Sequence, residues 1–133
     1  MSIVTWSDEY NVNVEKIDKQ HRHLLQLVNE LHSAVEERFD KEELRKMLIG
    51  LTEFTRTHFA TEEQLMSKHD YPNQQAHFRE HRMLLRHLGD LVTAVSNGKY
   101  PTFYSDYDVS TDWALVHINE YDKPLGDFLN EIE

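Results

Sequence analysis

The sequence predicts an all-α protein: an antiparallel up-and-down four-helix bundle with an extended N-terminal arm. Three observations support this prediction. Apolar residues recur at three- and four-residue steps in four separate stretches, which is the pattern of amphipathic helices. Turn-forming residues separate the four stretches. Only 4 Gly and 3 Pro occur among 133 residues, which are few turn-forming residues for a many-stranded sheet. We expect a single domain over residues 1–133.

The N-terminal arm is predicted over residues 1–17, where apolar residues such as Trp6 and Tyr10 show no sustained helical period. The first helix is expected over residues 18–39, with Asp18 as its N-cap. Its apolar positions are Leu24, Leu25, Val28, Leu31, Val35 and Phe39. The arm is therefore expected to pack on the bundle as a separate segment.

The second helix is expected over residues 40–69, with Asp40 as N-cap and Glu43 as the partner of a capping box. It ends before Pro72, because the residue preceding a proline is steered away from helical backbone angles. Its apolar stripe contains Leu44, Met47, Leu48, Leu51, Phe54, Leu65 and Met66.

The third helix is expected over residues 72–97, with Pro72 at its start and Gly98 just past its end. A loop of about a dozen residues, rich in Tyr and Asp, follows. The fourth helix is expected over residues 110–132. Four helices of these lengths are typical of an antiparallel bundle.

Composition narrows the classes of function. The net charge of −10, from 24 acidic and 14 basic residues, argues against partners such as nucleic acid or an anionic membrane. Cysteine is absent, which excludes disulfides, thiolate metal sites and cysteine nucleophiles and suits a cytoplasmic location. No apolar run approaches the roughly 18 residues of a spanning helix, and the N-terminus lacks a signal-peptide pattern.

The 9 histidines are informative because of where they fall. His58 and Glu62 are four residues apart, as are His77 and His81, so each pair lies on one helical face. These faces coincide with the apolar stripes, so the polar side chains point toward the predicted core. The whole inward-pointing set comprises His21, His58, Glu62, His77, His81, His117 and Asp122.

A single core histidine is more often a hydrogen-bonded structural residue than a ligand, and i,i+4 pairs are common on helix surfaces. Four helices that each place a histidine on the inward stripe favour a metal site, because buried carboxylates require a partner charge. The remaining histidines, His23, His32, His69 and His87, lack this support and are expected to be structural or surface residues.

The number and type of ligands indicate the metal. Seven ligands exceed the four or fewer that a zinc site takes from protein, and mixed imidazole and carboxylate ligands suit iron, so we expect two iron ions. If both carboxylates and a solvent-derived oxo or hydroxo group bridge two six-coordinate ions, one position stays vacant. Its predicted walls would admit a small ligand such as dioxygen and comprise Leu24, Phe59, Trp113 and Ile118.

One ligand pair does not fit a regular helix. His117 and Asp122 are five residues apart in the stretch HINEYDKP, which turns them about 140° from each other on an α-helix. Pro124 lacks an amide hydrogen and crowds the carbonyl of Glu120. We predict a local helix distortion over residues 118–124 that lets Asp122 turn toward the centre.

Four motifs together resemble the bacteriohemerythrin family: IDKQH (17–21), HFATEE (58–63), YPNQQAHFREH (71–81) and HINEYDKPLGDFL (117–129). The resemblance runs from the arm to the C-terminus, and the order and spacing of the seven ligand types make it specific. It implies a non-haem di-iron protein that binds dioxygen reversibly in a four-helix bundle.

The resemblance also implies roles for individual residues. His77, His81 and His117 would complete one iron, and the other two histidines would hold the iron that keeps an open position. Glu62 and Asp122 would bridge both irons together with the oxo or hydroxo group. Dioxygen would bind end-on at the open position as a hydroperoxide, and small anions would compete for the same place.

Two positions depart from the usual residues of this family. Asp70 stands where glycine is frequent, and aspartate tolerates a left-handed helix end. Ala114 stands in the oxygen pocket where a larger aliphatic residue, often leucine, is usual. The smaller side chain is expected to ease the access of anions and water and so to speed autoxidation.

Other functions stay open at the level of sequence. Di-iron oxidases and peroxidases of the ferritin-like type use carboxylate-rich Glu-x-x-His motifs, whereas this chain is richer in histidine. An oxygen or redox sensor would act through a separate protein partner, and a structural bundle would hold incidental zinc. We favour dioxygen carriage, storage or delivery without enzymatic turnover, for which a monomer suffices.

Overall fold

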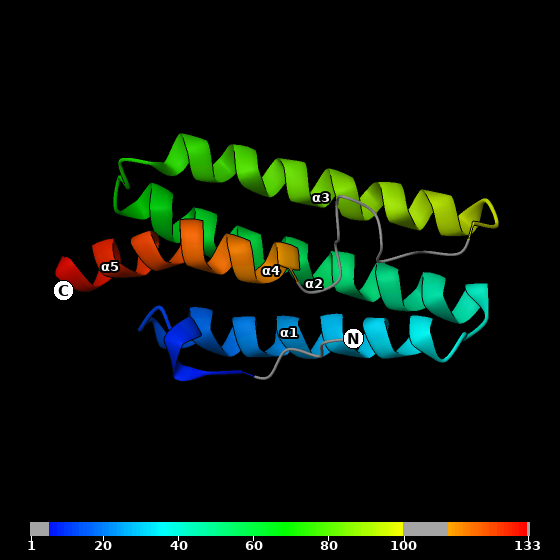
Figure 1. Ribbon diagram of the computed structural model, residues 1–133. Coiled ribbons are helices and arrows are strands. Elements are labelled where there is room, and N and C mark those ends of the chain that lie inside the picture. Colours follow the sequence, from blue (N-terminus) through cyan, green and yellow to red (C-terminus); the bar gives the residue numbers. More distant parts are fainter. Residues whose placement is uncertain (1–5, 100–111, 133) are drawn as a thin grey trace.

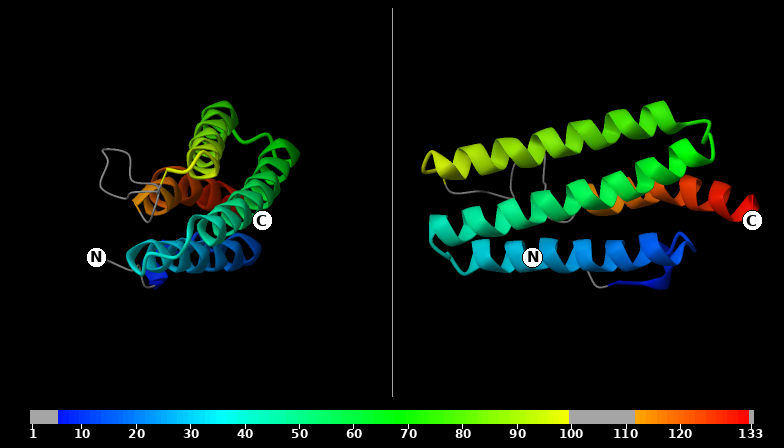
Figure 2. Two further views of the ribbon diagram at one scale, coloured as in Figure 1. Left: turned by 90° about the vertical axis from the view of Figure 1, so that its right-hand side faces the viewer. Right: turned by 180° about the vertical axis from the view of Figure 1, so that it is seen from behind.

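The computed structural model describes residues 6–99 and 112–132, and within these ranges every regular element is a helix. Three long helices and a fourth, segmented rod run back and forth along one direction (Figure 1). The elements are the 3₁₀ turn η1 (Asp8–Tyr10), α1 (Glu15–Glu36), α2 (Lys41–Lys68), α3 (Gln74–Ser96), α4 (Asp112–His117), the π-helix η2 (Ile118–Asp122) and α5 (Lys123–Glu131). The end-on view shows the four rods around one interior (Figure 2), and the predicted four-helix bundle is confirmed.

The first helix begins earlier than predicted. α1 starts at Glu15, and its N-cap is Val14, whose side chain makes no capping hydrogen bond. The expected cap, Asp18, instead accepts hydrogen bonds from the backbone N–H groups of Val12 (2.8 Å) and Asn13 (3.1 Å). The prediction was wrong because this carboxylate satisfies amides of the arm rather than amides of the first helical turn. It thereby holds the arm against the bundle.

α1 also ends at Glu36, three residues before its predicted end. The ends of α2 and α3 follow the predicted signals more closely. Asp40 caps α2 by accepting a hydrogen bond from the backbone N–H of Glu43 (2.9 Å). Asp70 has a φ of 54° just after α2, which confirms that aspartate occupies a left-handed helix end there. Gly98 has a φ of 92° after α3, a conformation that glycine adopts without steric cost. α3 begins at Gln74, two residues later than predicted.

The fourth rod contains the predicted distortion. In η2 the backbone N–H of Lys123 donates to the carbonyl of Ile118 five residues earlier, which is the hydrogen bond of a π-turn. Pro124, which has no N–H to donate, follows directly, and the rod continues beyond it as α5. The predicted first residues of this rod, 110 and 111, and the loop before them lie outside the described residues.

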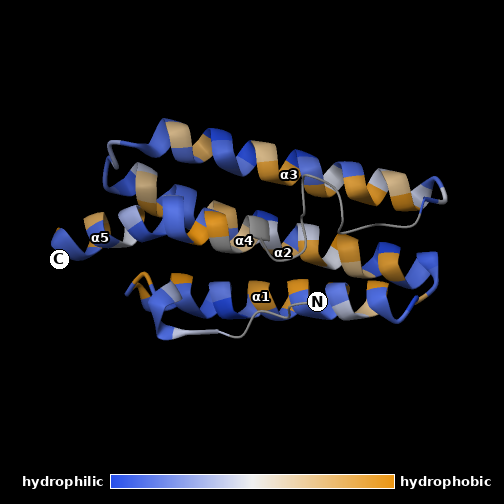
Figure 3. Cartoon of the chain, viewed as in Figure 1, coloured by the Kyte–Doolittle hydropathy of each residue, from blue (hydrophilic) through white to orange (hydrophobic). Residues whose placement is uncertain are grey.

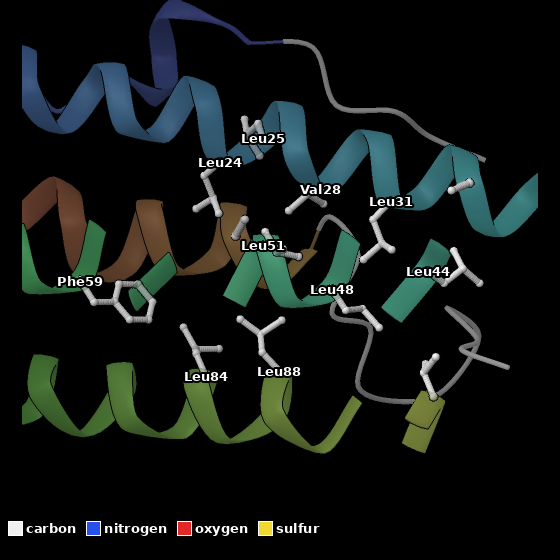
Figure 4. Packing of buried hydrophobic residues seen from close by; sticks show 13 residues of the cluster. Leu24, Leu25, Val28, Leu31, Leu44, Leu48, Leu51, Phe59, Leu84 and Leu88 are labelled. Atoms are coloured by element: carbon white, nitrogen blue, oxygen red, sulfur yellow. The ribbon is translucent and has the colours of Figure 1, made fainter. Parts of the chain in front are cut away.

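Two apolar clusters fill the interior, and apolar positions recur between polar ones along each helix (Figure 3). The larger cluster contains side chains of α1, α2 and α3 together with Ala114 of α4, and side chains from facing helices are turned toward one another (Figure 4). The smaller cluster joins the arm to α5 and comprises Val12, Ile17, Met66, Tyr71, Leu125 and Leu129.

The boundary between the two clusters is polar. On α1, Ile17 belongs to the smaller cluster and Leu24 to the larger, and His21 lies between them. On α2, Met66 belongs to the smaller cluster and Phe59 to the larger, and Glu62 lies between them. The polar side chains therefore form a layer that apolar packing seals on both sides. No helix in the described ranges has the length and apolar character needed to cross a membrane.

Gly126 marks a close approach between the arm and α5, and it generates a first prediction. A methyl group at Gly126 would meet the carbonyl oxygen of Val12 and, at 2.7 Å, its Cβ. Gly126→Ala is expected to lower the free energy of unfolding by about 1–3 kcal/mol, because relief of the helix penalty of glycine does not offset a clash with backbone.

The matched control is Gly89→Ala on α3, where an added Cβ meets no atom within 4 Å. It is expected to raise the free energy of unfolding by about 0.5–1 kcal/mol. Chemical denaturation of the metal-free variants measures both effects. If the two substitutions behaved alike, the close contact between Val12 and Gly126 would be contradicted.

Candidate metal centre

The structure brings together all seven polar side chains that the sequence pattern singled out. Each is exposed to solvent by 2% or less. They come from all four rods: His21 from α1, His58 and Glu62 from α2, His77 and His81 from α3, His117 from α4, and Asp122 from η2. The cluster is therefore buried in the polar layer of the bundle.

On α2 and α3, regular helix is sufficient to pair the polar side chains. Nε2 of His58 lies 3.1 Å from Oε2 of Glu62, and the ring centres of His77 and His81 are 4.5 Å apart. Residues four apart lie one above the other on a helical face, as the spacing predicted.

On the fourth rod, the π-turn makes the pair. A turn closed by an i→i+5 hydrogen bond contains one more residue than an α-turn, so residues five apart share a face. Nε2 of His117 consequently lies 3.1 Å from Oδ1 of Asp122. The distortion of η2 thus turns this carboxylate toward the cluster.

Each of the two carboxylates presents one oxygen to each of two groups of histidines. The two-histidine group consists of His21 and His58, and the three-histidine group consists of His77, His81 and His117. Toward the two-histidine group, Oε2 of Glu62 lies 3.1 Å from Nε2 of His58, and Oδ2 of Asp122 lies 2.7 Å from Nε2 of His21. These contacts occupy one side of each carboxylate.

The opposite oxygens face the three-histidine group. Oε1 of Glu62 lies 3.0 Å from Nε2 of His81, and Oδ1 of Asp122 lies 3.0 Å and 3.1 Å from Nε2 of His77 and His117. Donor atoms of this group and of both carboxylates lie within 4.8 Å of one another, and the same holds for the two-histidine group with the same carboxylates. The cluster thus consists of two adjoining candidate cation sites that share Glu62 and Asp122.

Several buried atoms of the cluster have no hydrogen-bond partner among the described residues. They include Nε2 of His21, His58 and His117, Oε2 of Glu62 and Oδ2 of Asp122. Some of these atoms approach one another closely without forming a properly directed hydrogen bond. Buried polar atoms left in this way call for a missing partner. Imidazole nitrogens and carboxylate oxygens together suit a metal such as iron.

The crowding of charged groups shifts pKa values in the metal-free cluster. Burial alone would lower the pKa of His21, but Asp122 and Glu62 raise it to about 9. The same opposition of burial and carboxylates raises the pKa of His77, and raises that of His117 well above its ordinary value. Burial would raise the pKa of Glu62 and Asp122, but neighbouring histidines hold both below their ordinary values. Protons on His21, His77 and His117 therefore balance the carboxylates when no metal is bound.

A hydrogen-bond chain behind His58 determines which ring nitrogen carries the proton. Oγ1 of Thr61 donates to the carbonyl of Thr57 (3.2 Å), so it accepts from the amide nitrogen of Gln20 (3.2 Å). That orientation turns Oε1 of Gln20 toward Nδ1 of His58, 2.7 Å away. Nδ1 must then donate, which leaves the lone pair of Nε2 directed into the cluster.

Two further carboxylates lie behind the three-histidine group. Nδ1 of His81 is 2.8 Å from Oε2 of Glu63, and Nδ1 of His117 is 3.6 Å from Oε2 of Glu80. The sequence pattern assigns no role to Gln20, Glu63 or Glu80. Each is adjacent in the chain to a residue of the cluster, yet each contacts a histidine on a different helix. Only the packing of helices against one another reveals these contacts.

Most of the predicted oxygen pocket is buried beside the cluster. Phe59 stacks on His81 with ring centres 3.7 Å apart and planes 3° from parallel. The side chain of Trp113 lies outside those that the structure describes. The buried pocket residues are Leu24, Phe59, Ala114 and Ile118. They supply apolar surface next to polar ligands, and their contact with dioxygen stays a prediction.

The other four histidines belong to neither cation site: His23, His32, His69 and His87. His23 is exposed on α1 and contacts the ring of Phe54, with ring centres 4.5 Å apart. His32 is buried. His23 is thus a suitable control for substitutions in the cluster.

The fold and the cluster define a four-helix-bundle protein with a buried histidine–carboxylate cluster that could hold metal ions. The family model described as the hemerythrin HHE cation binding domain matches residues 12–127. This chain belongs to the hemerythrin family, in agreement with the resemblance seen in its motifs.

Known relatives match over nearly the whole chain. A bacteriohemerythrin of Methylococcus capsulatus is 30% identical over 131 residues, which are 98% of this chain and 99% of the relative. A bacteriohemerythrin of Stenotrophomonas maltophilia is 25% identical and covers 91% of this chain and 88% of its own length. The crystal structure of a wild-type hemerythrin superposes with a TM-score of 0.80 at 28% identity, over 95% of this chain and 97% of that chain.

The pKa shifts predict how the stability of the metal-free protein depends on pH. The raised pKa of His21 stabilises the fold fully below its ordinary value of 6.5, and this contribution is lost as the pH rises through about 9. The lowered pKa of Glu62 stabilises the fold above its ordinary value of 4.5, and this contribution is lost in acid.

The free energy of unfolding without metal is therefore expected to be highest between about pH 4.5 and 6.5 and to fall by the order of a few kcal/mol toward pH 9.5. Urea denaturation in the presence of a chelator measures it. His23→Gln, a substitution outside the cluster, should keep the same profile, and a wild-type profile that stays flat from pH 6.5 to 9.5 would contradict the role of the buried ion pairs.

Proposed function

We propose that this chain binds dioxygen reversibly at a di-iron centre and serves in oxygen carriage, storage or delivery. Membership of the hemerythrin family supports, at the level of the family, an oxygen-binding di-iron protein. The observation that carries the proposal is that Glu62 and Asp122 each turn one oxygen to the two-histidine group and the other to the three-histidine group. This is the arrangement expected of carboxylates that bridge two metal ions.

The two proposed iron positions differ in how many side chains serve them. Both share the two carboxylates, and the two-histidine group provides one imidazole fewer. His21 and His58 would therefore hold the iron that keeps a position open for end-on binding of dioxygen. When bound, the two irons supply the electrons and the coordination position that dioxygen requires.

The chain itself orients the ligands and keeps water away. Gln20 holds His58 with Nε2 toward the cluster, and the π-turn of η2 directs Asp122 inward. Buried apolar side chains such as Phe59 and Ile118 stand beside the cluster and limit hydration of the site. A dry site opposes the side reactions that consume a reactive ligand.

Reversible binding fits this environment better than turnover. The ligand set contains five histidines and two carboxylates, all buried. The apolar ring of Phe59 stacks on His81 and offers no hydrogen bond to a polar second substrate, and Leu24 and Ala114 belong to the same apolar cluster as Phe59. We therefore propose that this chain is an oxygen-binding protein rather than an oxidase or peroxidase.

Absorption spectroscopy tests the proposal directly. The purified protein should hold two irons per chain, and its reduced form should gain a visible charge-transfer band on exposure to dioxygen and lose it under vacuum. A chain that takes up zinc in preference to iron would contradict the proposal. So would a band that decays promptly with oxidation of an added substrate, which is the behaviour of an enzyme.

Substitution of a proposed ligand should remove metal selectively. His117→Ala deletes one imidazole of the three-histidine group. Loss of a residue that only hydrogen-bonds to a metal ligand typically weakens metal binding by about 10–100-fold, and loss of a direct ligand should weaken it at least as much. The expected result is an iron content below two per chain, measured by elemental analysis. His23→Ala, which removes an exposed histidine outside the cluster, should retain both irons. Full retention of two irons in His117→Ala would refute its assignment as a ligand.

The size of residue 114 should control the rate of autoxidation. Ala114 is buried in the larger apolar cluster, so Ala114→Leu fills space near the proposed dioxygen position and should slow the loss of the oxygenated form. The added carbons are expected to cost about 1–3 kcal/mol of stability through overpacking. Loss of the charge-transfer band over time gives the rate. Ala60→Leu, on the exposed face of α2, should leave the rate unchanged. An unchanged or faster rate in Ala114→Leu would contradict the prediction.

A further inference from the structure

We infer that Glu63 and Glu80 make the two iron positions electronically unequal, so that the three-histidine position holds the ferric state more strongly than the two-histidine position. During oxidation by single electrons, the iron of the three-histidine group is then oxidised first. During reduction, the iron beside the open position is reduced first. This inference rests on the proposed function, because it requires two irons in the cluster.

The groups behind the histidine rings carry the asymmetry. Behind the three-histidine group, the carboxylate of Glu63 lies 2.8 Å from Nδ1 of His81, and that of Glu80 lies 3.6 Å from Nδ1 of His117. Behind the two-histidine group, His58 meets the neutral amide of Gln20 at 2.7 Å. Nδ1 of His21, like Nδ1 of His77 and His117, has no hydrogen-bond partner in the described ranges of the chain.

The shared ligands do not cancel this difference, and they do not cause it. Glu62 and Asp122 each present one oxygen to either group, so their negative charge is divided between the two positions. The additional imidazole of the three-histidine group is neutral when it binds metal. The contacts of the described residues therefore reveal one difference in charge between the two positions. The carboxylates of Glu63 and Glu80 lie behind the three-histidine group, and a neutral amide lies behind the two-histidine group.

The physical effect of an outer carboxylate is well defined. A carboxylate that accepts a hydrogen bond from Nδ1–H makes the imidazole a more basic ligand, and a more basic ligand stabilises the higher charge of ferric iron. An amide accepts the same hydrogen bond without adding negative charge. Both partners orient the ring, so the contrast between glutamate and glutamine isolates charge from position.

Burial and distance indicate which of the two carboxylates should have the larger effect on the iron of the three-histidine group. The Glu63 side chain is 39% exposed, so solvent screens part of its charge, but its hydrogen bond to His81 is short and direct. The Glu80 side chain is only 13% exposed, but at 3.6 Å from Nδ1 of His117 it is too far away for a hydrogen bond and acts on the ring through its charge alone. Glu63 is therefore the better first target, and Glu80 provides an independent second one.

Two isosteric substitutions with opposite changes of charge test the inference. Glu63→Gln removes a negative charge behind the three-histidine group, and Gln20→Glu adds one behind the two-histidine group. Glu53→Gln is the matched control, because it removes a charge from an exposed position of the same helix, where Glu53 pairs with Arg56. The measurement is a spectroelectrochemical titration of the iron-loaded protein without dioxygen, which yields two one-electron midpoint potentials.

Glu63→Gln is expected to raise the lower potential, and Gln20→Glu is expected to lower the higher one. Each variant should thus narrow the gap between the two potentials, while their mean moves in opposite directions. The expected size is about a tenfold change in the ratio of oxidised to reduced iron, which is about 59 mV for a one-electron couple. Glu80→Gln should act in the same direction as Glu63→Gln.

The failure of this inference is distinguishable from failure of the proposed function. If the wild-type chain held no pair of irons or formed no reversible dioxygen band, the proposed function would fail. If the wild type showed both and Glu63→Gln and Glu80→Gln each shifted the potentials no more than Glu53→Gln, the inference alone would be overturned. It would also be overturned if both variants lost iron at unchanged potentials, since the carboxylates would then act only as structural supports.

Discussion

The burial of two carboxylates next to each other is the constraint on which the rest of this structure depends. Glu62 and Asp122 are both fully buried, and the charge of Glu62 disfavours ionisation of Asp122. An unpaired buried charge costs several kcal/mol, and a close pair of like charges costs more. Imidazole rings from all four rods gather around these carboxylates. In the metal-free protein, the raised pKa values of His21, His77 and His117 favour their cationic forms, and all five rings are co-ligands in the proposed di-iron form. The four rods are therefore coupled through one polar layer.

The apolar packing and the polar layer have different roles. The larger apolar cluster and the smaller one lie on either side of the layer and exclude water from it. Exclusion of water strengthens every interaction between the carboxylates and the rings, because the local dielectric is low. Asp18 and Gly126 extend this seal by holding the arm against α5 and the bundle end. The stability of the fold and the chemistry of the cluster are thus linked by the same packing.

Much of this arrangement could be predicted from particular residues. The pairs His58 with Glu62 and His77 with His81 are local features, because regular helix alone places residues four apart on one face. The distortion near Pro124 was also predictable, although its form as a single π-turn was not. Asp18 was misassigned because a carboxylate near a helix start can bind amides of either neighbouring segment.

The sequence by itself determined the helical rods, the seven inward-pointing side chains and the membership of the family. All of these depend on spacing along one chain, which helical geometry converts directly into a shared face. Only the tertiary structure decided how the carboxylate oxygens divide between two groups of histidines and which neutral or charged group stands behind each ring. Gln20, Glu63 and Glu80 each reach a histidine on another helix, so their contacts depend on the rotation and depth at which the rods pack. No local pattern encodes that relation, because it arises from the packing of the whole bundle.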